Sequence, residues 1–256
     1  MLKKFSYIIL IIFCLLITGC SNSLKPINSI EDLSNSKIGV YTGSEYDTIL
    51  KNNIKGATPA YYNSYSDEIS ALKSGKIDAF LTDEPLAKEI LKNNDDLKIL
   101  DKKLTIDSYA FAINPQKTTL KEQIDKIILE MKTDGTLTEL EEKWFGDIEE
   151  KKVLEKYDYK YTNTIKFATV SGSAPFAYMK NNKIVGYDID VINYIGYKLG
   201  YKIEIVEMAF EGMIAALVTG KVDMAGCSII ITEERQKSVL FSEPNYTGGI
   251  VLVTRK

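Results

Sequence analysis

Short apolar runs alternate with helix-like segments along most of the chain. Residues 37–41 predict a strand, and a helix is expected from about Glu45 to Asn52. Residues 77–81 predict another strand, and Leu120 to Phe145 has the pattern of a helical stretch interrupted at 133–135 by Thr-Asp-Gly. This alternation indicates the α/β class.

One unit of this pattern occurs twice. Residues 69–78 and 214–223 carry the same isoleucine, alanine, leucine, glycine, lysine and aspartate at a constant offset of 145 residues. The apolar members fit the buried face of a helix, the glycine fits its end, and a strand follows. The repeat predicts two similar α/β lobes with a cleft between them.

The N-terminal residues resemble a bacterial lipoprotein signal. Two lysines precede an apolar run over 5–17, which is too short for a stable transmembrane helix and ends in Ile-Thr-Gly before Cys20. We expect residues 1–19 to be a signal peptide, Cys20 to be the lipid attachment site, and 20–29 to be a tether. An ordinary signal peptide with an incidental Cys20 is the alternative. The lipid would anchor an extracytoplasmic protein to the cell membrane, on the cell surface or the periplasmic side.

Composition removes several classes of function. The 256 residues suffice for one large or two small domains, and a net charge of −3 argues against a nucleic-acid partner. The chain has no histidine, which excludes Ser-His-Asp and Cys-His catalytic sites and histidine zinc sites. We expect no metal and no cofactor. Cys227 would be the one cysteine left without lipid after signal cleavage, and we interpret it as a small buried hydrophobic residue.

Residues 165–246 resemble the first half of an amino-acid-binding protein of the bacterial extracellular solute-binding family 3, the substrate receptors of ABC importers. The matching motifs are Ala174-Pro175-Phe176, Gly186-Tyr187-Asp188-Ile189-Asp190, the run 217–223, Ile231 to Lys237, and Phe241-Ser242-Glu243-Pro244. Residues 30–146 resemble the second half of the same family. There the motifs are Glu31-Asp32-Leu33, the run 37–40, the run 75–83, and Lys143-Trp144-Phe145-Gly146.

This resemblance implies a two-lobed, type II periplasmic-binding-protein-like α/β fold, in which each lobe is a mixed sheet flanked by helices. The halves stand in exchanged order, which is the mark of a circular permutation. A piece of a longer tandem protein is the alternative. Lobe 2 is expected over 30–104 and is completed by 250–256. Lobe 1 is expected to consist of a helical part, 110–146, and a main part, 165–244. The hinges are expected at 105–109 and 245–249, and a linker over 147–164.

Burying a free amino acid requires partners for its carboxylate and its ammonium group. Arg235 suits the carboxylate, because Thr232 is expected to cap a short helix with Arg235 in its first turn, and the resemblance places the family's carboxylate-binding arginine here. Only Arg235 and Arg255 are arginine in this chain. A solvated surface arginine is the alternative. Asp83 follows a strand and matches the family's ammonium-binding aspartate, with a plain helix N-cap before Pro85 as the alternative.

The resemblance adds further contacts to the ligand. Phe210 would stack on the ligand side chain, although its pattern also fits a core residue. Ser44 and Glu45 open a helix and would offer backbone N–H groups. The remaining candidate ligand contacts are Ser173, Ser228 and the backbone of Ile230. Asp188 and Asp190 are interpreted as residues at a helix start and not as ligand contacts.

Departures from the family pattern bear on specificity. Val170 replaces an acidic residue, Ser173 an aromatic residue, Ile230 a hydroxyl residue, and Glu45 another hydroxyl residue. A site with Glu45 and Asp83 fits a basic or uncharged polar amino acid better than glutamate or aspartate.

We therefore predict a monomeric, lipid-anchored receptor that binds an amino acid between closing lobes and delivers it to an ABC transporter permease. It would not be an enzyme. Two alternatives stay open. One is a dehydratase-like enzyme on the same scaffold with Glu45 as its acid, and the other is a ligand-sensing surface lipoprotein.

Overall fold

The computed structural model describes residues 26–146 and 163–256. The predicted signal peptide, Cys20, most of the tether and most of the linker lie outside the described residues. Within the described ranges, no helix is both long enough and apolar enough to cross a bilayer.

The first half of the described chain builds a sheet that we call the β1 sheet. Its strands, in spatial order, are β2 (Thr58–Tyr62), β1 (Lys37–Tyr41), β3 (Ala79–Asp83), β14 (Tyr246–Arg255) and β4 (Leu97–Ile99). Strands β2, β1 and β3 run parallel, whereas β14 is antiparallel to β3 and β4. The accompanying helices are η1 (Glu31–Leu33), α2 (Tyr46–Asn53), α3 (Tyr65–Lys73) and α4 (Glu84–Leu91). The chain's last strand thus completes the sheet that the first residues begin.

Residues 112–146 and 163–241 build the β7 sheet and its helices. Its strands, in spatial order, are β11 (Tyr201–Glu207), β7 (Asn163–Thr169), β12 (Met224–Ala225), β6 (Ala112–Ile113) and β13 (Leu240–Phe241). The accompanying helices are α5 (Thr118–Asp134), α6 (Thr136–Phe145), α7 (Tyr187–Leu199), η2 (Phe210–Gly212), α8 (Met213–Val218) and α9 (Glu233–Gln236). A small antiparallel sheet joins β8 (Gly172–Ser173), β9 (Ala177–Lys180) and β10 (Lys183–Val185). Both large sheets are mixed and flanked by helices, as predicted.

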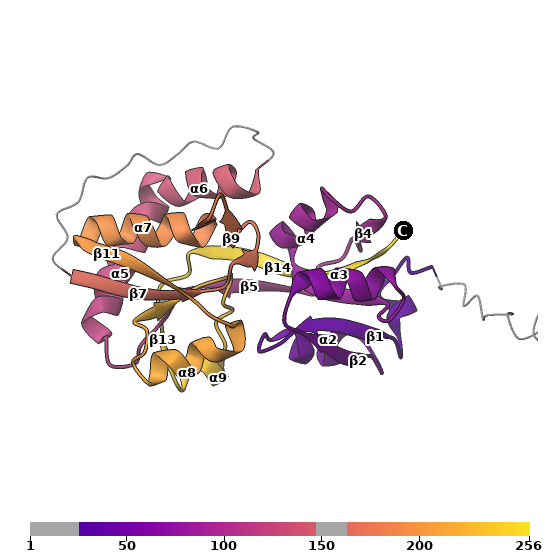
Figure 1. Cartoon of the computed structure of the whole chain (residues 1–256). Helices are drawn as coiled ribbons and strands as arrows, with labels where there is room; N and C mark the ends of the chain where they lie inside the picture. The colour runs from indigo at the N-terminus through magenta and orange to yellow at the C-terminus, as the bar shows by residue number, and fades with distance from the viewer. Residues whose placement is uncertain (1–25, 147–162) are drawn as a thin grey trace, which may run out of the picture.

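We call the β1 sheet with its helices the β1 body, and the β7 sheet with its helices the β7 body. Two strands run from one body to the other (Figure 1). Strand β5 (Thr105–Tyr109) pairs antiparallel with the first half of β14, from Tyr246 opposite Tyr109 to Ile250 opposite Thr105. The second half of β14 belongs to the β1 sheet. The segments expected to be hinges, 105–109 and 245–249, therefore lie side by side where the two sheets are joined.

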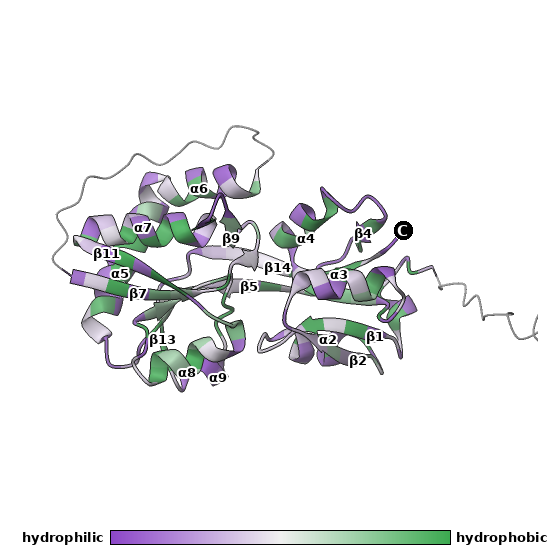
Figure 2. Cartoon of the chain, in the orientation of Figure 1, coloured by the Kyte–Doolittle hydropathy of each residue, from purple (hydrophilic) through white to green (hydrophobic). Residues whose placement is uncertain are grey.

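Alternation along each strand explains why β3 is buried on both faces. Leu81 belongs to the apolar cluster shared with α2, whereas Phe80 belongs to the cluster shared with α3 and α4. A separate core covers the β7 sheet and includes Phe167 and Phe111. Figure 2 shows hydrophobic residues concentrated on the strands, while the helices carry hydrophobic and hydrophilic residues on different sides. Ile27, from the predicted tether, is buried against the β1 sheet.

The structure corrects one predicted strand. Strand β3 begins at Ala79, two residues later than the expected 77–81, because the turn after α3 continues past its glycine. Gly75 takes a left-handed conformation, and the N–H groups of Lys76 and Ile77 both donate to the carbonyl of Ala71. The predicted helix interruption is confirmed, since α5 ends at Asp134 and Gly135 is left-handed.

Candidate functional site

A cavity lies between the two sheets, and the carboxyl ends of several strands face it. Its empty space is about 350 Å³, part of which is open to solvent. The lining residues are Tyr41, Ser44, Glu45, Tyr46 and Tyr65 from the β1 sheet and its helices, and Ser173, Phe210, Cys227, Ser228, Ile230 and Arg235 from the β7 body. Every residue predicted to contact the ligand lines this cavity except Asp83, which lies directly behind it.

Arg235 reaches across the cavity from the short helix α9. The hydroxyl of Thr232 accepts a hydrogen bond from the Arg235 N–H (3.2 Å), so the predicted cap is present. The side chain is buried, which excludes a solvated surface arginine. Its Nη1 donates to the Ile230 carbonyl (2.9 Å) and its Nη2 to the Gly43 carbonyl of the opposite body (3.1 Å), while Nε lies 3.4 Å from Oε1 of Glu45. Burial lowers the pKa of Arg235, and the negative charge of Glu45 opposes that effect.

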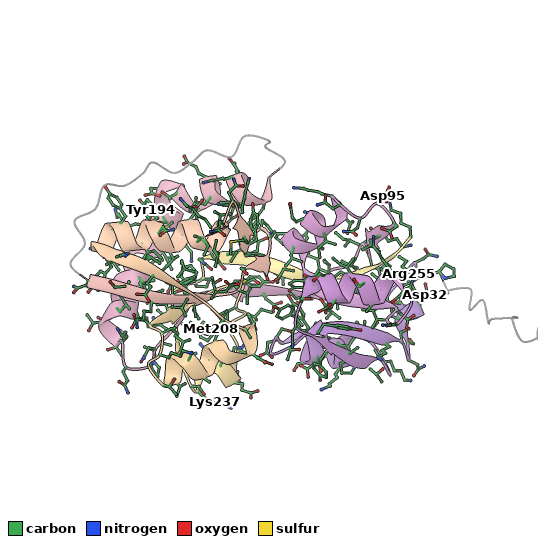
Figure 3. All side chains as sticks on the ribbon, viewed as in Figure 1. Asp32, Asp95, Tyr194, Met208, Lys237 and Arg255 are labelled. Carbon is green, nitrogen blue, oxygen red and sulfur yellow. The ribbon has the colours of Figure 1, made fainter. Side chains whose placement is uncertain are left out.

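The second arginine has a different place. Figure 3 shows Arg255 at the far end of the β1 body, near the C-terminus and away from the cavity. Its Nη1 donates to the carbonyls of Leu72 (2.5 Å) and Ile77 (2.8 Å). Arg255 therefore ties α3 and its turn to the sheet, and Arg235 is the arginine available to a ligand.

Asp83 ends β3 and immediately precedes α4. Its side chain makes no capping hydrogen bond, so it is not a plain N-cap. The carboxylate instead accepts hydrogen bonds from the hydroxyls of Tyr109 (2.7 Å), Ser228 (2.8 Å) and Tyr46 (3.1 Å). Burial raises the pKa of Asp83 to about 6, against the opposing effect of these three donors.

Ser228 links two buried carboxylates. It adopts a left-handed backbone conformation (φ 48°), in which its hydroxyl donates to Asp83 and its N–H donates to Oδ2 of Asp188 (3.0 Å). Asp188 lies in the first turn of α7, as predicted, and also accepts a hydrogen bond from Asn245 (3.4 Å). Burial raises the pKa of Asp188 to about 7, and the charge of Asp83 adds to the shift. Asp188 does not line the cavity; it holds Ser228.

Aromatic rings form one side of the cavity. The Phe210 ring lies 5.8 Å from the Arg235 guanidinium carbon and meets Tyr41 edge-on at 6.2 Å. Tyr41 also packs against Tyr65 at 4.8 Å. Phe210 is thus in place to contact a ligand. Neither Tyr41 nor Tyr65 was predicted from the sequence to line the site. Tyr41 ends a predicted strand, so the rule that open α/β sheets bind ligands at that edge could have found it.

The remaining predicted residues line the cavity but offer fewer free polar groups to a ligand. The N–H and the hydroxyl of Ser44 both donate to the Tyr41 carbonyl (3.1 and 2.6 Å), so its amide is committed to the turn. Ser173 is buried in β8, and the Ile230 side chain packs into the core of the β1 sheet while its carbonyl holds Arg235. Cys227 is a free, buried thiol that lines the cavity, and burial raises its pKa.

A wider space adjoins the cavity at Tyr41 and Tyr65. Its other lining residues are Asn63, Ser64, Ser66, Val170, Ser171, Gly172, Glu207, Met208 and Ala209. Figure 3 shows Met208 on the side of the β7 body that faces this region. We call this space the mouth of the cavity.

The family model of the bacterial extracellular solute-binding proteins, family 3, matches residues 19–147 and 165–256. The chain belongs to this family. Several of the curated relatives are named for an amino acid. A probable histidine-binding protein of Campylobacter jejuni is 40% identical over 85 residues, which is 33% of either chain. The L-cystine-binding protein TcyJ of Escherichia coli is 32% identical over 121 residues, 47% of this chain and 46% of that protein.

The arginine-binding extracellular protein ArtP of Bacillus subtilis is 37% identical over 82 residues, 32% of either chain. This family 3 chain therefore spans between a third and a half of the length of the curated relatives it matches.

Proposed function

We propose that the protein binds a polar or basic amino acid between its two bodies and delivers it to the permease of an ABC importer. One observation carries the proposal: Arg235 lines the cavity from one body, and Asp83, from the other body, lies directly behind it and accepts a hydrogen bond from Ser228 in its lining. A guanidinium and a carboxylate are the partners that the two charged groups of an amino acid need away from water. The relatives named for histidine, cystine and arginine support this ligand class.

The proposed delivery requires the two bodies to open and close. Strands β5 and β14 would act as the hinge, because they run between the sheets. Two hydrogen bonds cross the cavity, from Arg235 to Gly43 and from Ser228 to Asp83. Both would help to hold the bodies together around the ligand. We propose that a single chain, without a partner copy, does this.

A thermal-shift screen of the twenty amino acids tests the proposal. A ligand that binds only the native state at 100 times its Kd raises stability by about 2.7 kcal/mol, so the correct amino acid should raise Tm clearly. Arg235→Ala should abolish the shift. Lys237→Ala is the matched control, since this exposed lysine lies two residues further on and at the outer edge of the molecule (Figure 3). Absence of a shift with all twenty, or an unchanged shift in Arg235→Ala, contradicts the proposal.

An enzymatic role has less support. The dehydratase-like alternative needs a protonated acid, and Glu45 was the candidate. Its carboxylate lies 3.4 Å from Nε of Arg235, so it faces a charged group of the protein itself. Recovery of unchanged amino acid after incubation agrees with a binding protein. The sensing alternative is tested by whether the neighbouring genes encode a permease and an ATPase.

We also propose that Cys20 carries a lipid, on the strength of the sequence motif alone. Cys20→Ser should move the protein from the membrane fraction to the medium or periplasm. Cys14→Ser, which changes a thiol inside the apolar run, is the control and should leave the protein in the membrane fraction. Membrane retention of Cys20→Ser would refute the anchor.

Finally, we propose that the two halves of the family stand in exchanged order. The motifs quoted from the sequence carry this proposal; the family model matches the two stretches separately, on either side of the 147–164 linker. A recombinant chain in which 165–256 precede 30–146 should bind the same amino acid as the original. A native protein much heavier than the mature chain would favour the tandem alternative.

A further inference from the structure

Glu45 is the one carboxylate that lines the cavity among the described residues. It stands at the N-cap of α2, yet its side chain makes no capping hydrogen bond. Instead Oε1 lies 3.4 Å from Nε of Arg235, and the carboxylate is a quarter exposed to the space a ligand would occupy. The local helix therefore does not explain this acid, whereas the contact across the cavity does.

We propose, on the basis of the amino-acid-binding function proposed above, that Glu45 is a built-in counter-ion of Arg235 and makes the site select amino acids with a positively charged side chain. It is a specificity-determining residue, and the ligand class is cationic amino acids.

The guanidinium can serve Glu45 and a ligand at once. An arginine side chain has five N–H donors. Two of them donate to the carbonyls of Ile230 and Gly43, and Nε, which carries a third, lies 3.4 Å from the carboxylate of Glu45. Two donors remain for the carboxylate of a ligand. Binding then places two carboxylates on one guanidinium.

The charge balance of the filled site follows. Arg235 and Glu45 cancel, and Asp83 behind Ser228 adds one negative charge. A zwitterionic ligand brings no net charge, so its complex keeps one uncompensated negative charge in a largely buried space. A ligand with a cationic side chain brings the missing positive charge. Because uncompensated buried charge is costly, the cationic ligand is favoured.

The mouth offers a place for that side chain. Among the described residues, Glu207 is the one charged residue that lines it, and it accepts a hydrogen bond from Ser171. The rings of Tyr41 and Tyr65 lie between the cavity and the mouth, and aromatic faces attract cations. Arg235 is the one basic residue among the described residues that line either space, and it belongs to the cavity. Glu207 would therefore attract a cationic side chain into the mouth.

Isothermal titration calorimetry with two ligand pairs tests the inference. Each pair differs chiefly in side-chain charge: L-arginine with L-citrulline, and L-lysine with L-norleucine. The native protein should prefer the cationic member. Glu45→Gln should reduce that preference by about tenfold, and the Kd of the neutral member should fall. Asp47→Asn is the matched control, because Asp47 lies on the same helix but bonds to Lys51 and Tyr61 outside the cavity, and it should keep the native preference.

The possible outcomes separate this inference from the proposed function. If amino acids bind but Glu45→Gln keeps the native preference, or if the native protein prefers the neutral members, the role of Glu45 is refuted and the amino-acid receptor stands. If none of the twenty amino acids binds the native protein, the proposed function itself fails. Thermal unfolding of Glu45→Gln checks that the variant is folded.

Discussion

Lowering the pH from 7 to 5 should stabilise the ligand-free protein against unfolding. Asp83 and Asp188 are buried without a cationic partner, and burial raises their pKa values to about 6 and about 7 from an ordinary value of 3.8. A carboxyl whose pKa is higher in the folded protein binds more protons there than in the unfolded chain. Its contribution to stability is therefore present at acid pH and is lost as the pH rises through the folded-state pKa.

The size of the effect follows from these pKa values. Between pH 7 and pH 5, proton linkage adds about 1 kcal/mol from Asp83 and about 2 kcal/mol from Asp188. Burial also raises the pKa of Glu68, which adds to the change in the same direction. The range is favourable for the measurement because the chain has no histidine to titrate in it.

Urea denaturation at pH 5, 6 and 7, without ligand, measures this change. Asp188→Asn should remove about 2 kcal/mol of the pH dependence of the unfolding free energy. Asp190→Asn is the matched control on the same helix, since Asp190 pairs with Lys143 (2.7 Å) and accepts from Trp144 (2.7 Å). A stability that is flat or falls between pH 7 and pH 5 would refute the assignment of two buried, cation-free carboxylates.

Three further predictions concern the cavity. The Kd of L-arginine should rise about tenfold from pH 7 to pH 5, because the ammonium group needs ionised Asp83, and Asp83→Asn should flatten this calorimetric profile. Ser228→Ala removes a buried hydrogen bond to a charged group and should cost about 1.5–3 kcal/mol in urea denaturation at pH 7; a cost below 0.5 kcal/mol would contradict the contact. Gly43→Ala should weaken L-arginine binding more than Gly135→Ala does. Both glycines have a left-handed backbone, but of the two only Gly43 faces the opposite body, where an added Cβ would lie 2.7 Å from Cα of Glu211. Equal Kd values for these two glycine variants would show that the close approach does not matter.

Much of the fold could be predicted from local patterns. Apolar runs, capping residues and the glycine at 135 located most elements, because these signals act over a few residues. The boundary error at β3 arose where Lys76 and Ile77 prolong a turn by bonding back to Ala71. A hydrophobic run does not show whether its first residues belong to the strand or to the preceding turn, since Ile77 is buried in the turn as it would be in the strand.

The candidate site could be predicted only in part. Arg235 and Asp83 stood out because their residue types and positions match a known family. The hydroxyls of Tyr46 and Tyr109 on Asp83 could not be predicted, since they depend on how α2 and β5 pack around the end of β3. The role of Ser228 could not be predicted either. Its N–H donates to Asp188 and its hydroxyl to Asp83, and both contacts depend on a left-handed backbone that serine rarely adopts.

Arg235 and Asp83 are proposed to bind the two charged groups of one amino acid, and a crystal structure of the protein with L-arginine would locate both groups. We expect the ligand carboxylate within hydrogen-bonding distance of the Arg235 guanidinium, the α-ammonium group on Asp83, and the side chain directed past Tyr41 toward the mouth. Arginine bound outside this cavity, or with its carboxylate away from Arg235, would refute the proposed site.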